Sequence, residues 1–200
     1  MSTQSRKYSL KARAETQAET RRRIVAATSE LHDEVGPART TVAEIARRAG
    51  VQRLTVYNHF PSEKELFAAC GDHWLAQNPP PDPSAALALA NPAERMRAVL
   101  AAFYRWYRKS ARGQENLQRD RLVIPALDAL MRILMDERRN NLAEALAAGF
   151  KPGARSAKRL RAAISLALDF WTWRRLAGEG MSDDDAAALM VVAATAAARA

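Results

Sequence analysis

The sequence is short of the residues that form disulfides and membrane spans. Its single cysteine, Cys70, excludes an intramolecular disulfide and suits a reducing compartment. The longest apolar stretches, residues 85–90 and 186–198, are too short or too rich in alanine to cross a membrane. The polar N-terminus lacks the apolar core of a signal peptide. We therefore expect a cytoplasmic protein with no membrane partner.

The sequence also has few residues that interrupt helices and no clear strand pattern. Glycine and proline number only 8 and 9 among 200 residues, and no alternating run of β-branched residues is long enough for a strand. Alanine, leucine, arginine and glutamate, which favour helices, dominate instead. The predicted fold class is all-α.

The residues of catalytic and metal sites show no suitable pattern. There is no activated nucleophile, phosphate-binding loop or pair of acids in a catalytic setting. His32, His59 and His73 are too far apart along the chain for a local metal-ligand motif. Residues 183–185, all aspartate, are better explained as the charged first turn of a helix. We expect no enzyme activity, no metal and no cofactor, and we expect Cys70 to be a packed thiol.

Positive charge is abundant, and it is concentrated at one end. The chain has 31 lysines and arginines against 22 acids, a formal net charge of +9 that favours a polyanionic partner. Seven of the basic residues fall within the first 23: Arg6, Lys7, Lys11, Arg13, Arg21, Arg22 and Arg23. Only Glu15 and Glu19 oppose them there. Residues 1–17 have almost no apolar pattern and predict a flexible basic arm.

Proline and glycine divide the rest of the chain. Residues 78–83 contain four prolines and no periodicity, so they predict the boundary between a domain over 18–77 and a domain over 84–200. In the second domain, caps and periodicity predict helices over 92–110, 114–122, 125–149, 156–177 and 183–199.

Two short helices around a tight glycine turn give the clearest signal. Thr41 and Glu44 form a capping box that predicts a helix over 42–49. Gly50 ends that helix, and a second helix follows over 52–59. This is the layout of a helix-turn-helix.

The two faces of this motif have different residues. The residues expected to pack inward are Ile45, Ala49, Val51, Val56 and Phe60. The second helix is expected to present Arg53, Leu54, Tyr57 and Asn58 outward, as i,i+4 pairs. Arginine can donate two hydrogen bonds to guanine, asparagine pairs bidentately with adenine, and leucine can contact a thymine methyl. The alternative to a DNA-reading motif is a helical hairpin whose charged residues only keep its surface solvated.

The stretch 39–67 resembles the DNA-binding signature of the TetR/AcrR family. The matching motifs are T-T-V-A-E-I-A-R-R-A-G-V, T-V-Y-N-H-F and P-S-E-K-E-L-F. The resemblance covers residues 18–77, while the remainder matches only in length and helical character. It implies a three-helix DNA-binding domain followed by a helical ligand-binding and dimerisation domain.

The resemblance also implies roles for single residues. Those that match backbone-contacting positions are Thr41, Tyr57, His59 and Lys64. Those at or near base-reading positions are Ala43, Arg53, Leu54 and Asn58, and Thr55 belongs to the same DNA-binding set. Two positions depart from the family pattern. Gln52 replaces a frequent serine cap, and Leu54 replaces a frequent small residue.

Apolar and aromatic residues of the second domain suggest an effector site. The predicted ligand-binding residues are Phe103, Tyr107, Met131, Met135 and Trp171, which fit an apolar or aromatic small molecule. Such residues more often form a core, which is the alternative. A dimer is expected through the last two helices, along Leu160, Ile164, Leu168 and Trp171 on one and Leu189, Val192 and Ala196 on the other. The helix over 63–77 is the expected lever between the domains.

The function predicted from these features is a ligand-responsive repressor that binds near-palindromic double-stranded operator DNA as a homodimer. The alternative is an operator-binding protein whose C-terminal domain serves only dimerisation or protein contacts. An RNA-binding or nonspecific nucleoid protein would use the basic arm without needing a base-reading face.

Overall fold

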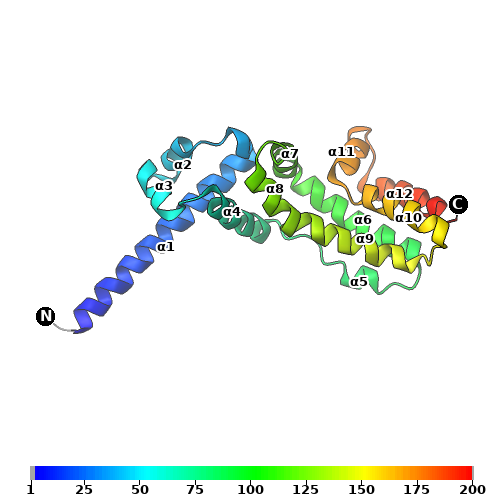
Figure 1. The fold of residues 1–200 in the computed structure, drawn as a ribbon, viewed down its shortest axis with the longest axis horizontal. Coiled ribbons are helices and arrows are strands. Elements are labelled where there is room, and N and C mark those ends of the chain that lie inside the picture. The colour runs from blue at the N-terminus through cyan, green and yellow to red at the C-terminus, as the bar shows by residue number, and fades with distance from the viewer. Residues whose placement is uncertain (1–2, 200) are drawn as a thin grey trace. The chain divides into compact units, whose positions relative to one another are not determined.

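The fold is that of a computed structural model, which describes residues 3–199 and the side chains from residue 10 onward. Every regular element in that range is helical, as the all-α prediction requires (Figure 1). The elements are α1 (Thr3–Glu34), η1 (Pro37–Arg39), α2 (Val42–Ala49), α3 (Arg53–His59), α4 (Glu63–Gln77), α5 (Ser84–Leu87), α6 (Pro92–Lys109), α7 (Ala111–Asp120), α8 (Pro125–Met131), η2 (Arg132–Asp136), α9 (Glu137–Gly149), α10 (Ala154–Ala167), α11 (Phe170–Gly178) and α12 (Asp183–Arg199). No helix in the described range is long and apolar enough to cross a membrane.

The chain forms two compact units. The first contains the chain up to Gln77 together with Glu115–Leu130, and the second contains Asn78–Gln114 and the chain from Met131 onward. From the sequence, residues 115–130 were expected to belong to the domain over 84–200. In the structure they group with the first unit.

The first unit is built around the second half of α1. Ile24, Leu31, Ile45 and Val56 form its buried core, and Cys70 is buried among them as expected. Burial raises the pKa of the Cys70 thiol to about 12, so it stays protonated at neutral pH.

The start of α1 differs from the predicted flexible arm over 1–17. The helix already begins at Thr3, and residues 1 and 2 lie outside the described range. The physical reason is that residues 3–34 contain no proline or glycine and many good helix formers, so no residue stops the helix N-terminal to its packed half.

Helices α2 and α3 form the predicted helix-turn-helix. The Thr41 side chain accepts a hydrogen bond from the Glu44 N–H at 3.2 Å and caps α2. Gly50 adopts φ +63°, and the N–H of Val51 donates back to the Ala46 carbonyl at 2.9 Å. Glycine tolerates this left-handed conformation at little cost, so the chain turns sharply into α3.

The second unit has an aromatic core. Tyr104 and Tyr107 on α6 are buried, and their hydroxyls donate to the carbonyls of Ala167 and Leu168, both at 2.8 Å. Phe170 of α11 packs edge-on against Tyr107, with 5.5 Å between ring centroids. These contacts fix α6 against the end of α10 and the start of α11.

Two long helices of the second unit are less regular than predicted. The helix over 125–149 contains the π-helical segment η2 in its middle. The helix over 156–177 is two helices, because the Asp169 carboxylate caps α11 by accepting from the Trp171 N–H at 2.9 Å. The first of these begins at Ala154, so Ser156, the first residue of the predicted range, lies inside the first turn of α10 and donates to the Gly153 carbonyl at 3.2 Å.

Candidate nucleic-acid interface and effector site

One face of α3 exposes four large polar, aromatic and aliphatic side chains. Arg53 and Asn58 are exposed, and Leu54 and Tyr57 are 65% and 54% exposed. A leucine and a tyrosine left this open on a well-packed helix are uncommon and indicate a binding surface. The face matches the four residues that the sequence predicted to point outward.

The opposite face of α3 fixes the helix in place. Val56 is 2% exposed, and it packs in the core with Ile45 of α2 and Phe60 just after α3. The inward-packing prediction is confirmed. Because a rigid scaffold holds this helix, its exposed side chains are presented at fixed spacing.

The other predicted DNA-binding residues also lie in the first unit, and none is buried. Thr41 and Lys64 are exposed, at the starts of α2 and α4. Ala43, Thr55 and His59 are half-buried. Gln52 precedes α3 without a side-chain capping bond, which agrees with the expected weak cap.

Two arginines of α1 bind the ends of the helix-turn-helix, a role that was not predicted from the sequence. Arg23 donates to the Ala49 carbonyl at the end of α2 and to the Gly50 carbonyl. Arg21 donates to the His59 carbonyl at 2.9 Å and lies over the Phe60 ring at 4.1 Å. Their cationic side chains satisfy carbonyls that a helix end leaves free. Only their basic character was visible in the sequence.

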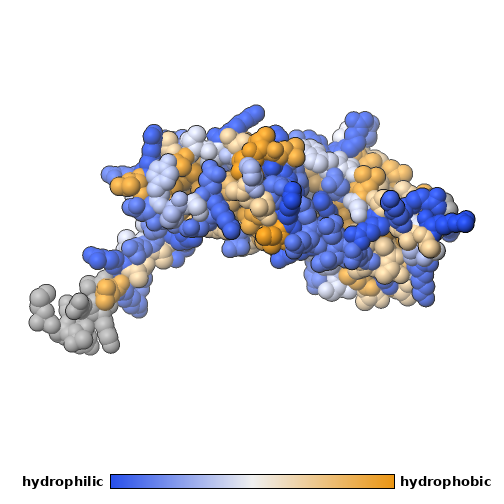
Figure 2. All heavy atoms as spheres, in the orientation of Figure 1, coloured by the Kyte–Doolittle hydropathy of each residue, from blue (hydrophilic) through white to orange (hydrophobic). Residues whose placement is uncertain are grey.

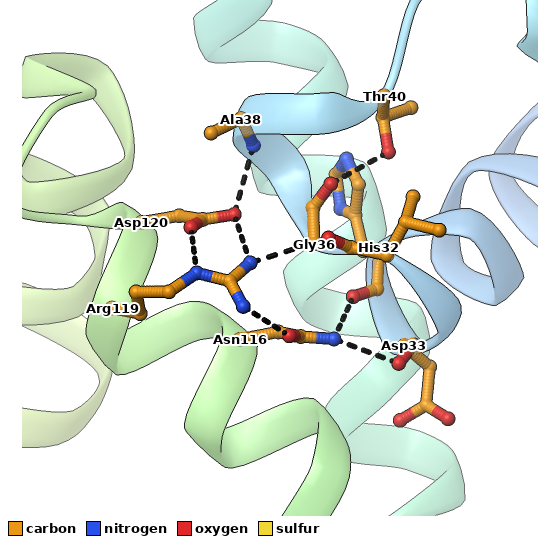
Figure 3. Close-up of polar contacts among 9 residues, drawn as sticks. His32, Asp33, Gly36, Ala38, Thr40, Asn116, Arg119 and Asp120 are labelled. Atoms are coloured by element: carbon orange, nitrogen blue, oxygen red, sulfur yellow. Dashed lines mark hydrogen bonds and ion pairs between the residues drawn. The ribbon is translucent and has the colours of Figure 1, made fainter.

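A polar network ties α7 to the end of α1 (Figure 3). Asn116 donates to the carbonyls of His32 and Asp33 at 3.1 and 2.8 Å. Arg119 pairs with Asp120, and the Asp120 carboxylate accepts from the Ala38 N–H at 2.9 Å. These bonds explain why residues 115–130 belong to the first unit.

Ionisable groups in this network are strongly perturbed. Burial alone would raise the pKa of Asp120, but the bonds from Arg119 and Ala38 lower it below its usual value. Burial lowers the pKa of His32 to about 4, against an opposing pull from Asp120. At neutral pH the network therefore contains a carboxylate and a neutral imidazole.

The five predicted effector residues lie in the second unit in differing environments. Tyr107 and Met131 are buried, and Phe103 and Met135 are half-buried. Trp171 is 44% exposed. An open hollow of about 330 Å³ is lined by Trp171, Arg174, Arg175, Gly178 and Glu179. The other four predicted residues do not line this hollow.

Gln114 is a candidate polar contact that was not predicted from the sequence. Its side chain is fully buried, and neither its amide nitrogen nor its oxygen has a hydrogen-bond partner within the described range. A buried amide without partners is costly and is expected to bind a ligand or a water. A single glutamine in a polar helix gave no signal of this.

The predicted dimer stripe on α10 is buried in the chain's own core. Leu160, Ile164 and Leu168 are at most 1% exposed. They are therefore unavailable to a second subunit. Leu189 and Val192 of α12, which belong to the second predicted stripe, are exposed, and so is Leu166 of α10, which was not predicted.

Comparisons with known proteins agree with this architecture. The sequence model of a family described as "Bacterial regulatory proteins, tetR family" matches residues 24–70. No similar sequence was found among curated proteins.

Two solved structures share the fold. A TetR-like transcriptional regulator from Rhodococcus sp. RHA1 is 22% identical with a TM-score of 0.55, over 88% of this chain and 93% of that one. A second transcriptional regulator from the same organism is 19% identical with a TM-score of 0.58, over 86% and 94% of the two chains.

Proposed function

We propose that the chain is a TetR-family transcriptional regulator, since residues 24–70 match that family's model, and that it acts as a ligand-responsive repressor that binds near-palindromic operator DNA as a homodimer. The observation that carries the proposal is the exposed face of α3 on a buried, well-packed framework. This face is suited to the major groove, where base edges can be distinguished.

The residues divide by the part of DNA that they contact. Arg53 and Asn58 read base edges, and Leu54 contacts a thymine methyl. Thr41, Tyr57, His59 and Lys64 bind the backbone, while Ala43 and Thr55 lie close to the bases. Backbone contacts fix the position of α3, and base contacts give the preference for one sequence.

Selection from random DNA tests this part of the proposal. The full chain is used to enrich duplexes from a random pool, and affinity for the enriched duplex is compared with affinity for random duplex from 50 to 200 mM salt. We expect a near-palindrome bound at least about 1,000-fold more tightly than random DNA. Equal affinity for both duplexes at every salt concentration would contradict it and favour nonspecific binding.

The exposed apolar residues of the second unit support a homodimer. Leu189 and Val192 lie one turn apart on α12, and Leu166 lies on α10, which packs against α12. A second copy would cover these side chains in a symmetric interface. A near-palindromic operator then requires the two copies of α3 to lie about 34–36 Å apart, one turn of DNA.

Sedimentation of single variants tests the dimer. Val192→Asp should give monomers at micromolar concentration, because it places a charge in the apolar interface. Leu122→Asp is the matched control, since Leu122 is 83% exposed but lies in the first unit. A dimer that survives Val192→Asp, or that Leu122→Asp disrupts equally, would argue against this interface.

Effector response is the second half of the proposal. The effector is an apolar or aromatic small molecule held among Phe103, Tyr107, Met131, Met135 and Trp171, with Gln114 as its polar contact. Because the buried Gln114 amide has no partner in the part of the chain that the structure describes, a ligand that bonds this amide gains a hydrogen bond without breaking one in the protein.

Residues 115–130 give this effector a route to the DNA-binding unit. The chain leaves the second unit after Gln114 and returns to it at Met131, so the segment is covalently tied to that unit at both ends. Asn116 and Asp120 bind it to α1 and η1. This segment acts together with α4, the lever expected from the sequence.

Reciprocal titration tests the coupling. Compounds are screened by tryptophan fluorescence, and the best is titrated with and without the enriched duplex. A coupling of about 1–3 kcal/mol lowers operator affinity about 5- to 150-fold, and DNA must weaken compound binding by the same factor.

A packed core favours the second candidate, an operator-binding protein whose second unit serves only dimerisation or protein contacts. The hydroxyls of Tyr104 and Tyr107 already have protein partners. If no compound changes operator affinity while the selected duplex still binds, this second candidate is the correct one.

A further inference from the structure

The N-terminal part of α1 extends beyond the core of its unit. Every described side chain from Leu10 to Glu19 is exposed, and the first buried residue of the helix is Ile24. Figure 1 shows this part of α1 continuing past α3, and Figure 2 shows mostly hydrophilic atoms along its described portion. We name residues 3–20 the N-terminal arm.

None of the described side chains of the arm, those from Leu10 to Thr20, is buried against its own unit. A helix that buries no side chain gains no stability from packing, and isolated helices of this length are marginal in water. The arm therefore has a surface that is free for a partner.

The charges of the arm are sorted by face. Lys11 lies 4.0 Å from Glu15, and Arg22 pairs with Glu19 at 2.5 Å. At about 100° per residue these four side chains share one side of the helix. Both acidic residues of the arm, Glu15 and Glu19, are therefore paired with basic residues on that side.

The opposite side keeps its positive charge. Arg13, Gln17 and Arg21 recur every four residues and form one ridge. Arg13 has no acidic partner among the residues with described side chains. Cationic and neutral donors alone make up this ridge.

Arg21 shows which way the ridge points. Its guanidinium bonds the carbonyl of His59, the last residue of α3, and covers the Phe60 ring. Gln17 and Arg13 lie one and two turns before Arg21 on the same ridge. The ridge therefore extends outward from the end of the helix that is proposed to read DNA.

We propose that the N-terminal arm binds DNA phosphates beside the half-site contacted by α3. This inference rests on the proposed DNA-binding function and extends its footprint. From Thr20 to Thr3 the helix spans about 25 Å at about 1.5 Å per residue. That length covers about seven base pairs at about 3.4 Å each. An unpaired arginine next to a base-reading helix matches a phosphate in charge and in hydrogen-bonding geometry.

A matched pair of variants tests the arm. Arg13→Ala removes the unpaired cation, and Lys11→Ala removes a cation from the opposite, acid-paired side. Both positions are exposed and alanine favours helix, so circular dichroism and thermal unfolding should not change. Each protein is titrated by fluorescence anisotropy with three duplexes: the selected palindrome with short flanks, the same palindrome with ten added base pairs on each side, and a random duplex of the longer length.

The expected result is specific to Arg13 and to flanking DNA. The unmodified chain should bind the long-flanked duplex more tightly than the short one, and Arg13→Ala should reduce that gain. Loss of one phosphate contact lowers the slope of log affinity against log salt concentration by about 0.9 per subunit. The affinity that Arg13→Ala loses relative to the unmodified chain should therefore be about threefold larger per subunit at 50 mM salt than at 200 mM salt. Lys11→Ala should change the gain and the slope much less.

Two results would overturn the inference while leaving the proposed function intact. One is tight binding of the palindrome that does not depend on flank length. The other is an equal effect of Arg13→Ala and Lys11→Ala. If instead no sequence is enriched but Arg13→Ala still weakens binding to random duplex, the arm contact stands and the proposed function fails.

Discussion

The exposed face of α3 in the first unit and the aromatic core of the second unit differ in how far their side chains are exposed. In the first unit, Tyr57 and Leu54 remain exposed on a helix whose other face is buried. In the second unit, Tyr104, Tyr107 and Phe170 are at most 5% exposed, and the tyrosine hydroxyls bind backbone carbonyls. A surface that reads a long polymer must be open, whereas a small effector must be enclosed. The exposure of a side chain therefore identifies a binding site better than its chemical type alone does.

The largest expected effect comes from the network that joins α7 to α1. Gly36 has φ +93°, and a Cβ there would overlap the side chains of Arg119 and Asp120. Gly36→Ala should therefore lower the free energy of unfolding by about 3 kcal/mol or more, through backbone strain and a broken ion pair. Urea denaturation followed by circular dichroism measures this.

The matched control is Gly178→Ala at the end of α11. No atom lies within 4 Å of a Cβ built there, and the φ of Gly178 is not positive. Its stability should stay the same or rise by about 0.5–1 kcal/mol. Equal losses of stability in both variants would show that the network around Gly36 does not stabilise the first unit.

His32 should make the first unit sensitive to acid. Its pKa is about 4 in the fold against 6.5 for the free side chain, so the unfolded chain binds the extra proton between these values. The stability from neutral His32 is complete above pH 6.5 and is lost as the pH falls towards 4. The full loss is at most about 3 kcal/mol.

Urea denaturation from pH 7.5 to 4.5 checks this for two substitutions. His32→Gln should flatten the pH dependence of stability in that window, whereas His73→Gln should keep it. His73 is only half-buried and provides the matched histidine. An unchanged pH profile in His32→Gln would mean that the imidazole is not the titrating group.

Substitution of Gln114 in the second unit should have a smaller effect on the free energy of unfolding, and it should raise it. The fully buried Gln114 amide has no partner among the described residues, so Gln114→Leu should raise the free energy of unfolding by about 1–2 kcal/mol. The same variant should weaken binding of any effector identified by the fluorescence screen. Gln17→Leu, at an exposed position, should leave the stability nearly unchanged. A destabilised Gln114→Leu would show that the amide is satisfied in solution.

The helix-turn-helix could be predicted from the sequence because its determinants are local. The Thr41 cap, the Gly50 turn and the spacing of Val56 and Phe60 act within a few residues of one another. The exposed face of α3 follows directly from that spacing.

Features that depend on distant contacts were not predictable. Arg23 caps the end of α2, and Asn116 binds the end of α1, yet both contacts join segments far apart in the sequence. Likewise, Ile164 and Leu168 have a periodicity that suits a core and a dimer interface equally well, and only tertiary packing decides between them. The break at Asp169 had a local signal, an aspartate before a new apolar run, that was overlooked.

Base-by-base binding measurements on Arg53→Ala and Lys64→Ala test operator reading most directly. Every base pair of the selected half-site is changed in turn, and affinity is measured for the unmodified chain and both variants. Arg53→Ala should lose about 1–3 kcal/mol on the best duplex and become indifferent to one base pair, whereas Lys64→Ala should weaken all duplexes alike and lower the salt slope by about 1. If Arg53→Ala kept both the affinity and the full base preference, α3 would not read the operator as described.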